Sequence, residues 1–217
     1  MIETAKVYQR VNQILKTGTS GYQSEDEFNS DMYSTLLKIL TVCSDNYEKN
    51  AKISDMMNKS GLVLSEILTS DAQGIINFPT KHFRSFSMRY VSGGNEYPMT
   101  KISTNEVGMH LTSPIRGFNA TKNKFGWYLS DGVINVLPKS AVSVKFTYCN
   151  TPDIPVLVLT ANADDYETID ASTTDIELPE NLFNLFVYEM VNRAGMEMKE
   201  ELSMQYSQMG ISQENVI

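Results

Sequence analysis

The hydrophobic pattern of this chain changes its period twice, and this change limits the folds that the sequence can adopt. Near both ends, apolar residues recur every three or four positions, which is the spacing of one helix face. Between residues 75 and 160 they form short runs separated by turn residues, which is typical of β-strands. The sequence therefore predicts an α+β protein, with a helical bundle made from the N-terminal and C-terminal helices and an inserted antiparallel β-rich lobe.

The N-terminal part predicts several helices. The first covers residues 3–16, where apolar side chains recur with helical spacing. The second follows Ser24, which can form a capping box with Glu27, and it ends near Tyr47. Residues 48–70 are more polar and are interrupted by a glycine, so we expect one or two shorter helices there.

The middle of the chain predicts a β unit. Its clearest element is a hairpin over residues 128–136, in which Asp131 and Gly132 supply the positive φ angles of a two-residue turn. Residues 142–148 alternate between apolar and polar side chains, as in a strand with one buried face. A short helix is expected over residues 103–111. Further strands are expected at 75–78, 87–91 and 156–160.

The C-terminal part predicts a loop and then helices. Residues 161–178 carry acidic side chains and no basic one, which indicates an extended acidic loop. A helix opens at Pro179, is expected to end at Gly195, and is followed by a short helix near residues 198–209. The expected divisions are residues 1–73 for the N-terminal helices, 74–160 for the β-rich lobe, 161–178 for the acidic loop and 179–217 for the C-terminal helices.

The sequence offers few residues for catalysis. The only histidines are His82 and His110, no GxSxG motif accompanies them, and we interpret both as structural or surface residues. A pair of carboxylates for glycoside hydrolysis stays open, because any two of the 26 acidic residues could meet in a cleft, but nothing favours it. We therefore expect that the protein is not an enzyme.

Metal sites and membrane segments are also not indicated. Cys43 and Cys149 lie far apart without a CxxC motif, so neither a disulfide framework nor a zinc ribbon is supported. Calcium binding by the acidic loop is a weaker alternative, because the loop lacks the ligand alternation of an EF-hand. No signal-peptide segment and no apolar run of roughly 18 residues are present, so we expect a soluble, non-secreted protein without cofactor or metal.

Several short motifs follow one another in a fixed order over nearly the whole chain. They are Val7-Tyr8 with Val11 and Ile14-Leu15, Gly21-Tyr22 with Glu27-Phe28-Asn29, Phe78-Pro79, Ser113-Pro114, Leu137-Pro138 after the hairpin, Glu177-Leu178-Pro179-Glu180 and Ala194-Gly195. In this order the motifs resemble those of the head-to-tail connector ring proteins of tailed bacteriophages. The resemblance is greatest to the tail-barrel ring proteins of crAss-like phages that infect Bacteroidetes.

The resemblance implies a structural virion protein that is made in the host cytoplasm. It implies a homo-oligomeric, dodecameric ring below the portal, in contact with the portal or other tail ring proteins. The ring would form part of the conduit for genome ejection, through which DNA passes without sequence-specific binding, and no membrane is involved. The basic segment around residues 116–124 and the acidic loop are not part of the pattern that carries the resemblance.

The charges of the chain suggest how such a ring would close. Residues 81–145 contain nine basic and three acidic residues, whereas residues 146–217 contain two basic and 13 acidic ones. A ring requires that one patch of each subunit meets a different patch of the next subunit. We hypothesise that basic residues of one subunit face acidic residues of its neighbour: Arg84, Arg116, Lys122 and Lys124 against Asp164, Asp165, Glu167 and Asp170.

One other class of function is open. Basic and aromatic residues alternate between residues 81 and 97, and such a surface can stack single-stranded nucleic acid. The alternative function is therefore a soluble nucleic-acid-binding accessory protein that uses the basic β lobe. The formal net charge of −8 weakens this alternative, because affinity for nucleic acid comes mostly from neutralising phosphates.

Overall fold

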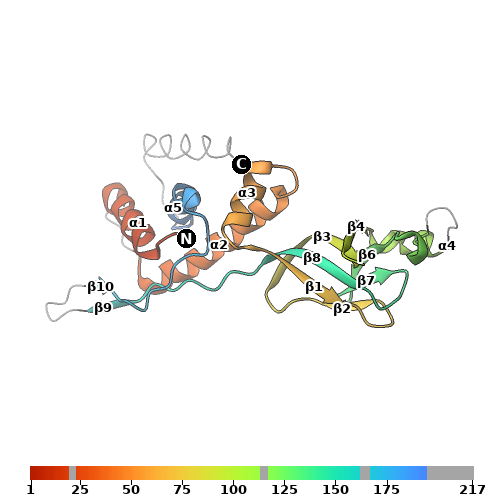
Figure 1. Ribbon diagram of the computed structural model, residues 1–217. Helices are drawn as coiled ribbons and strands as arrows, with labels where there is room; N and C mark the ends of the chain where they lie inside the picture. Colours follow the sequence, from red (N-terminus) through yellow and green to blue (C-terminus); the bar gives the residue numbers. More distant parts are fainter. Residues whose placement is uncertain (20–22, 113–116, 162–166, 195–217) are drawn as a thin grey trace. The chain divides into compact units, whose positions relative to one another are not determined.

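The computed structural model describes residues 1–19, 23–112, 117–161 and 167–194 (Figure 1). The chain is mixed α/β, and its sheets are mostly antiparallel. It divides into two compact units, the first made of residues 1–62 and 152–217 and the second of residues 63–151. Within the described residues, every helix is too short or too polar to cross a lipid bilayer.

The first unit is mainly helical. Its described residues form the helices α1 (Thr4–Thr19), α2 (Glu25–Asn46), α3 (Ala51–Lys59) and α5 (Phe183–Arg193), and the 3-10 turn η3 (Glu180–Leu182) precedes α5. Helix α5 packs against α1 and α2, and α3 packs against α2. The apolar faces that the sequence predicts meet here: Tyr8 contacts the buried ring of Phe28 edge to face, with ring centroids 5.1 Å apart.

The start of α2 confirms the predicted capping box. The Ser24 hydroxyl accepts the Glu27 N–H at 3.4 Å, and the Glu27 carboxylate accepts the Ser24 N–H at 3.1 Å. The backbone N–H and then the hydroxyl of Ser24 lower the pKa of Glu27, because both hydrogen bonds favour its charged form. The helix ends with Tyr47 as its C-cap, which also agrees with the prediction.

The prediction for residues 48–70 is only half right. Residues 51–59 form α3, which begins at the N-cap Asn50, but residues 63–69 form the strand β1 (Val63–Thr69). Gly61 lies between the two elements with a φ of 79°, a conformation that glycine adopts without strain. One of the one or two expected helices is therefore present, but the strand was not predicted, and the chain changes to β-structure before residue 74.

An extended segment passes along the start of α2 in the first unit. The Asn29 side chain accepts the Leu157 N–H at 2.7 Å and donates to the Leu157 carbonyl at 2.9 Å. The Glu25 carboxylate accepts the Leu159 N–H at 3.0 Å. Side chains of a helix thus take the place of a neighbouring strand, and they satisfy backbone groups that would otherwise be buried without partners.

This segment leads into a short hairpin. Strand β9 (Leu159–Ala161) pairs antiparallel with β10 (Glu167–Ile169). The strand expected over residues 156–160 is therefore shorter and begins later. The prediction of an extended acidic loop over residues 161–178 did not include the strand β10, and residues 162–166 lie outside the described part of the chain.

The second unit contains two four-stranded sheets. One sheet has the order β1, β8 (Ser143–Asn150), β3 (His82–Ser92) and β4 (Asn95–Pro98). The other has the order β2 (Ile75–Asn77), β7 (Val133–Leu137), β6 (Gly126–Ser130) and β5 (Thr100–Lys101). All pairs in these sheets are antiparallel except β5 with β6.

Both sheets contribute to one apolar core. Its buried residues are Ile76, Met88, Met99, Phe125, Trp127, Ile134, Val136, Val144, Phe146 and Tyr148. Trp127 of β6 meets Phe146 of β8 edge to face, with centroids 6.3 Å apart, which joins the two sheets. The predicted alternation along β8 is confirmed, because Val144, Phe146 and Tyr148 are buried.

The turns agree with the sequence in part. Asp131 and Gly132 have φ angles of 55° and 73° and connect β6 to β7, as predicted. The short helix expected over residues 103–111 is present as η1 (Thr104–Glu106) and α4 (Val107–Thr112), and its N-cap is Ser103. Another 3-10 turn of this unit is η2 (Ala120–Lys122).

The C-terminal helix begins later than predicted. Pro179 is the N-cap of η3, not the first residue of a helix, and α5 starts at Phe183. Gly195 and the helix expected near residues 198–209 lie outside the described residues.

Candidate functional site

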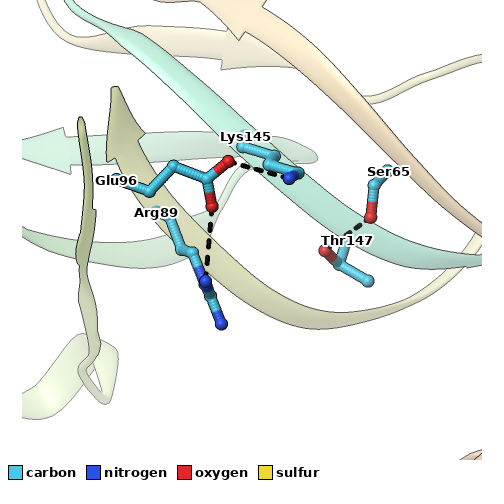
Figure 2. Close-up of polar contacts among 5 residues, drawn as sticks. All are labelled: Ser65, Arg89, Glu96, Lys145 and Thr147. Carbon is cyan, nitrogen blue, oxygen red and sulfur yellow. Dashed lines mark hydrogen bonds and ion pairs between the residues drawn. The ribbon is translucent and has the colours of Figure 1, made fainter. Parts of the chain in front are cut away.

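The outer face of the β1-β8-β3-β4 sheet carries polar side chains from all four strands (Figure 2). Because side chains alternate along β8, the burial of Phe146 places its neighbours Lys145 and Thr147 on the opposite face. Arg89 of β3 lies in register with Lys145, and Ser65 of β1 lies in register with Thr147. The sheet thus presents ordered cations and hydroxyl groups on a largely exposed surface.

The Glu96 carboxylate joins two cations on this face. It accepts hydrogen bonds from Lys145 Nζ at 2.8 Å and from an Arg89 guanidinium nitrogen at 3.3 Å, as Figure 2 shows. The hydrogen bond from Lys145, and then that from Arg89, lower the pKa of Glu96. These side chains are 33–58% exposed, so water and salt screen both ion pairs and each adds little to the stability of the fold. Their main effect is to fix the positions of the two cations.

The β1 side of this face is less charged. The Ser65 and Thr147 hydroxyl groups form a hydrogen bond of 2.9 Å between β1 and β8. Two residues further along β1, Ile67 lies in register with Lys145 and is 68% exposed. An apolar side chain this exposed on an edge strand is available for contact with another surface.

Glu66 and Tyr148 form a further polar contact between β1 and β8. The Tyr148 hydroxyl donates to the Glu66 carboxylate at 2.8 Å, although the remainder of Tyr148 is buried in the core. Burial, and then the hydrogen bond to Glu66, raise the pKa of Tyr148 to about 12. The phenol therefore stays neutral at physiological pH, and its contact holds the edge strand to the core.

His82 is the residue that most resembles a catalytic group. Its Nε2 lies 3.0 Å from the Ser85 hydroxyl, but the imidazole stacks on Phe78 with centroids 4.2 Å apart, and Ser85 is buried. Burial lowers the pKa of His82. The pair packs within the second unit, which agrees with the interpretation of His82 as a structural residue. His110 stacks on Phe118 with centroids 4.9 Å apart.

Metal binding finds no support in the described part of the chain. Those residues contain no group of three or more histidine, cysteine, aspartate or glutamate side chains placed to hold an ion. The Cys43 and Cys149 thiols are both buried, and they lie in different units.

The basic residues of the predicted contact occupy two places in the second unit. Arg84 lies on β3 and is exposed. Lys122 and Lys124 lie in the turn before β6, where Asn119 and Lys124 form an isolated antiparallel bridge. The structure thus brings Lys122 and Lys124 together on one turn and places Arg84 on the other sheet. Arg116 lies outside the described residues.

The acidic residues of the predicted contact lie in the first unit. Glu167 is exposed on β10, and Asp170 follows that strand. Asp170 accepts hydrogen bonds from the Ser172 hydroxyl at 2.6 Å and the Ser172 N–H at 2.8 Å, and these bonds lower its pKa. Asp164 and Asp165 lie outside the described residues.

The aromatic residues of the alternative nucleic-acid surface are mostly not free to stack on bases. Phe86 is 7% exposed, and the partly buried Tyr90 stacks on Tyr97 and contacts the core residue Phe125. These aromatic side chains therefore pack mainly within the second unit.

On the outer face of the β1-β8-β3-β4 sheet and its edge, sequence reasoning missed β1, the double contact of Glu96 and the Glu66–Tyr148 hydrogen bond. Strand β1 could have been predicted from its composition. Residues 63–69 are rich in β-branched and aliphatic side chains, which favour a strand. The two contacts depend on cross-strand register, which no local pattern reveals.

A comparison with models of protein families finds no match to this chain. No curated protein matches it either.

Proposed function

We propose that this chain is a structural ring subunit of the head-to-tail connector or tail barrel of a tailed phage. The ordered motifs that resemble crAss-like tail-barrel ring proteins suggest this class of protein. The observation that carries the proposal further is the charge of the two units. Residues 63–151 contain nine basic and five acidic residues, a formal net charge of +4, whereas the remaining residues contain nine basic and 21 acidic ones, a formal net charge of −12.

Unlike surfaces on one chain favour a closed ring of identical subunits. A heterologous contact joins one patch of each subunit to a different patch of the next, and it closes into a ring when the rotation allows. The positive unit of one copy and the negative unit of its neighbour supply such a pair. Opposite charges steer this encounter and set its register more than they add affinity.

The finer architecture belongs to the same proposal. The helices of the first unit form the bundle of the ring subunit, and the β-rich lobe is inserted between its N-terminal and C-terminal parts. The subunit is made in the host cytoplasm and is found in the virion. There a dodecameric ring contacts the portal or other tail ring proteins.

The ring also forms part of the path for genome ejection. The net negative charge of the chain suits a conduit, because a wall that binds phosphates would slow the passage of DNA. The acidic first unit is therefore expected to line the channel.

Native mass spectrometry and negative-stain electron microscopy of the purified chain test the proposal. We expect closed rings of one size at low ionic strength, and partial dissociation as salt screens the contact between the two charges. A chain that stays monomeric at all protein and salt concentrations would contradict the ring.

The +4 charge of the second unit also favours a second candidate, a nucleic-acid-binding accessory protein. A filter-binding assay with single-stranded DNA separates the two functions. The ring subunit is expected to bind weakly at low salt and to lose this binding at physiological salt. Tight binding that persists at physiological salt would favour the accessory protein.

A further inference from the structure

A groove in the first unit lies between α1 and the β9–β10 hairpin. Its volume is about 620 Å³, and it is open to solvent. One wall is formed by Gln9, Asn12, Gln13 and Lys16, which recur along one face of α1. The other wall is formed by Leu159 of β9 and by the three residues of β10. The groove is thus bounded by side-chain amides and Lys16 on one side and by a short strand on the other.

One residue of the α1 wall, Asn12, carries a buried polar atom without a partner. Asn12 is 6% exposed, and its Oδ1 is buried without a hydrogen-bond donor. A buried acceptor without a donor is unfavourable, because it has lost its water without replacement. Asn12 lines the groove, so a rotation of its side-chain amide can present this oxygen to a donor that enters the groove.

The same unit shows what kind of donor an asparagine on a helix can take. On α2, the Asn29 side chain pairs with both the N–H and the carbonyl of Leu157, which lies in an extended segment. A side-chain amide on a helix therefore already serves as the ladder partner of an extended backbone in this fold. Asn12 has the same side chain and is likewise next to strand structure.

The second unit contains an edge strand, β1, that is suited to this groove. β1 pairs with β8 along one side, and it is the longest of the strands at the ends of the two four-stranded sheets in the described residues. Its sequence contains no lysine, arginine or proline, the residues that commonly protect the edge of a sheet. Ile67 of β1 is 68% exposed and can cover the aliphatic wall formed by Leu159 and Ile169.

We propose that the groove between α1 and β10 receives the edge strand β1 of a second copy of this chain, with a backbone N–H of β1 donating to Asn12 Oδ1. The proposal rests on the proposed function and deepens it, because it names a contact that closes the ring. The groove belongs to the unit with a net charge of −12, and β1 belongs to the unit with a net charge of +4, so the attraction acts between the two units as wholes and not through β1, which carries Glu66 and no basic residue. The contact is heterologous, as a ring requires.

Photo-crosslinking tests this contact in the full chain. Gln13 is exposed on the groove wall, and it is replaced by p-benzoylphenylalanine in a mixture of normal and ¹⁵N-labelled protein. We expect cross-linked peptides of mixed label that contain residues 63–69. The exposed Lys49 carries the same photoreactive residue as a control and is expected to give no such product. Cross-links within one label only, or to other segments, would overturn the proposal.

Two substitutions sharpen the test. Ile67→Lys should reduce the mixed-label product at least about tenfold, because it places a charge in the contact. Ile154→Lys changes an isoleucine that is 60% exposed in the first unit, and it should leave the yield unchanged. Equal yields from the two variants would contradict the assignment of β1.

The substitution Asn12→Leu tests whether Asn12 acts in the contact between copies or only in the fold of the subunit. It removes an oxygen that has no partner within the subunit, so it should leave the melting temperature of the monomer equal or higher while the yield falls. A lower melting temperature with an unchanged yield would show that Asn12 serves only the fold.

The outcomes also distinguish this inference from the proposed function. Rings without a β1 product would overturn the inference and leave the ring standing. A β1 product from a species that never exceeds a dimer would support the contact and contradict the ring. A monomer without any product would overturn both.

Discussion

The residues around His82 favour the neutral form of its imidazole. Its imidazole stacks on Phe78 and also lies beside Phe146 and Tyr148, with centroids 5.7 Å from each. Aromatic rings solvate a charged imidazole poorly, and burial accordingly lowers the pKa of His82. The contact with Ser85 is compatible with the neutral form, since a neutral imidazole nitrogen can either donate or accept.

This environment predicts that acid destabilises the second unit. In the unfolded chain the pKa of His82 returns to about 6.5, so the unfolded state takes up the proton first as pH falls. The contribution of His82 to the free energy of unfolding is therefore complete above about pH 6.5 and decreases as the pH falls below it. His82→Phe keeps an aromatic ring and removes the titration, so its melting temperature should fall less between pH 7.5 and pH 5 than that of the wild type.

Ser85→Ala is the control for this prediction. It removes the hydroxyl partner but keeps the imidazole among the rings, and burial rather than Ser85 lowers the pKa of His82. The variant should therefore retain the acid sensitivity of the wild type. If His82→Phe and the wild type lost equal stability in acid, His82 would not be the titrating group.

At the scale of elements, the first unit depends on side chains of α2 that complete an extended segment. Asn29 satisfies both backbone groups of Leu157, a residue that is fully buried. Asn29→Ala would leave these two groups without partners. We expect it to lower the free energy of unfolding by about 1–3 kcal/mol, measured by urea denaturation.

A matched substitution on the same helix controls for helix propensity. The Asn46 side chain donates only to the Val42 carbonyl of its own helix at 2.9 Å, so Asn46→Ala should change stability by less than about 0.5 kcal/mol. Equal effects of the two variants would mean that the segment around Leu157 does not need α2.

Elements with strong local signals could be predicted from the sequence. The capping box of Ser24 and the Asp131-Gly132 turn satisfy backbone groups within a few residues, so their patterns are visible locally. Strands β1 and β10 could not be placed. β1 is stabilised by β8, about 80 residues further along the chain, and β10 has only three residues.

The same reasoning applies to the candidate site. Basic and acidic stretches are visible in the sequence, but the double contact of Glu96 with Lys145 and Arg89 depends on strand register. The unpartnered oxygen of Asn12 follows from burial on α1. Neither feature has a motif, because each arises from residues that the fold brings together.

At the scale of the whole molecule, the proposed ring requires that the positive unit of one copy binds the negative unit of the next. The acidic variant replaces Asp164, Asp165 and Glu167 with lysine and Asp170 with asparagine. Asparagine at position 170 keeps an oxygen that can accept the two hydrogen bonds of Ser172, so the turn is preserved. The basic variant replaces Arg84, Lys122 and Lys124 with glutamate. Each variant places like charges at a contact that needs opposite ones.

We expect each variant alone to raise the dissociation constant for ring assembly at least about tenfold at low ionic strength, which corresponds to about 1.4 kcal/mol per contact. An equimolar mixture of the two variants should recover part of the assembly, because half of the possible neighbours then carry complementary charges. Analytical ultracentrifugation measures the three samples beside a control with Asp45→Lys and Glu48→Lys, which changes exposed acidic residues of the first unit away from β10. If both variants assembled at the same protein concentration as the wild type, the contact would be refuted. If the control lost assembly as well, net charge, rather than the named residues, would determine the association.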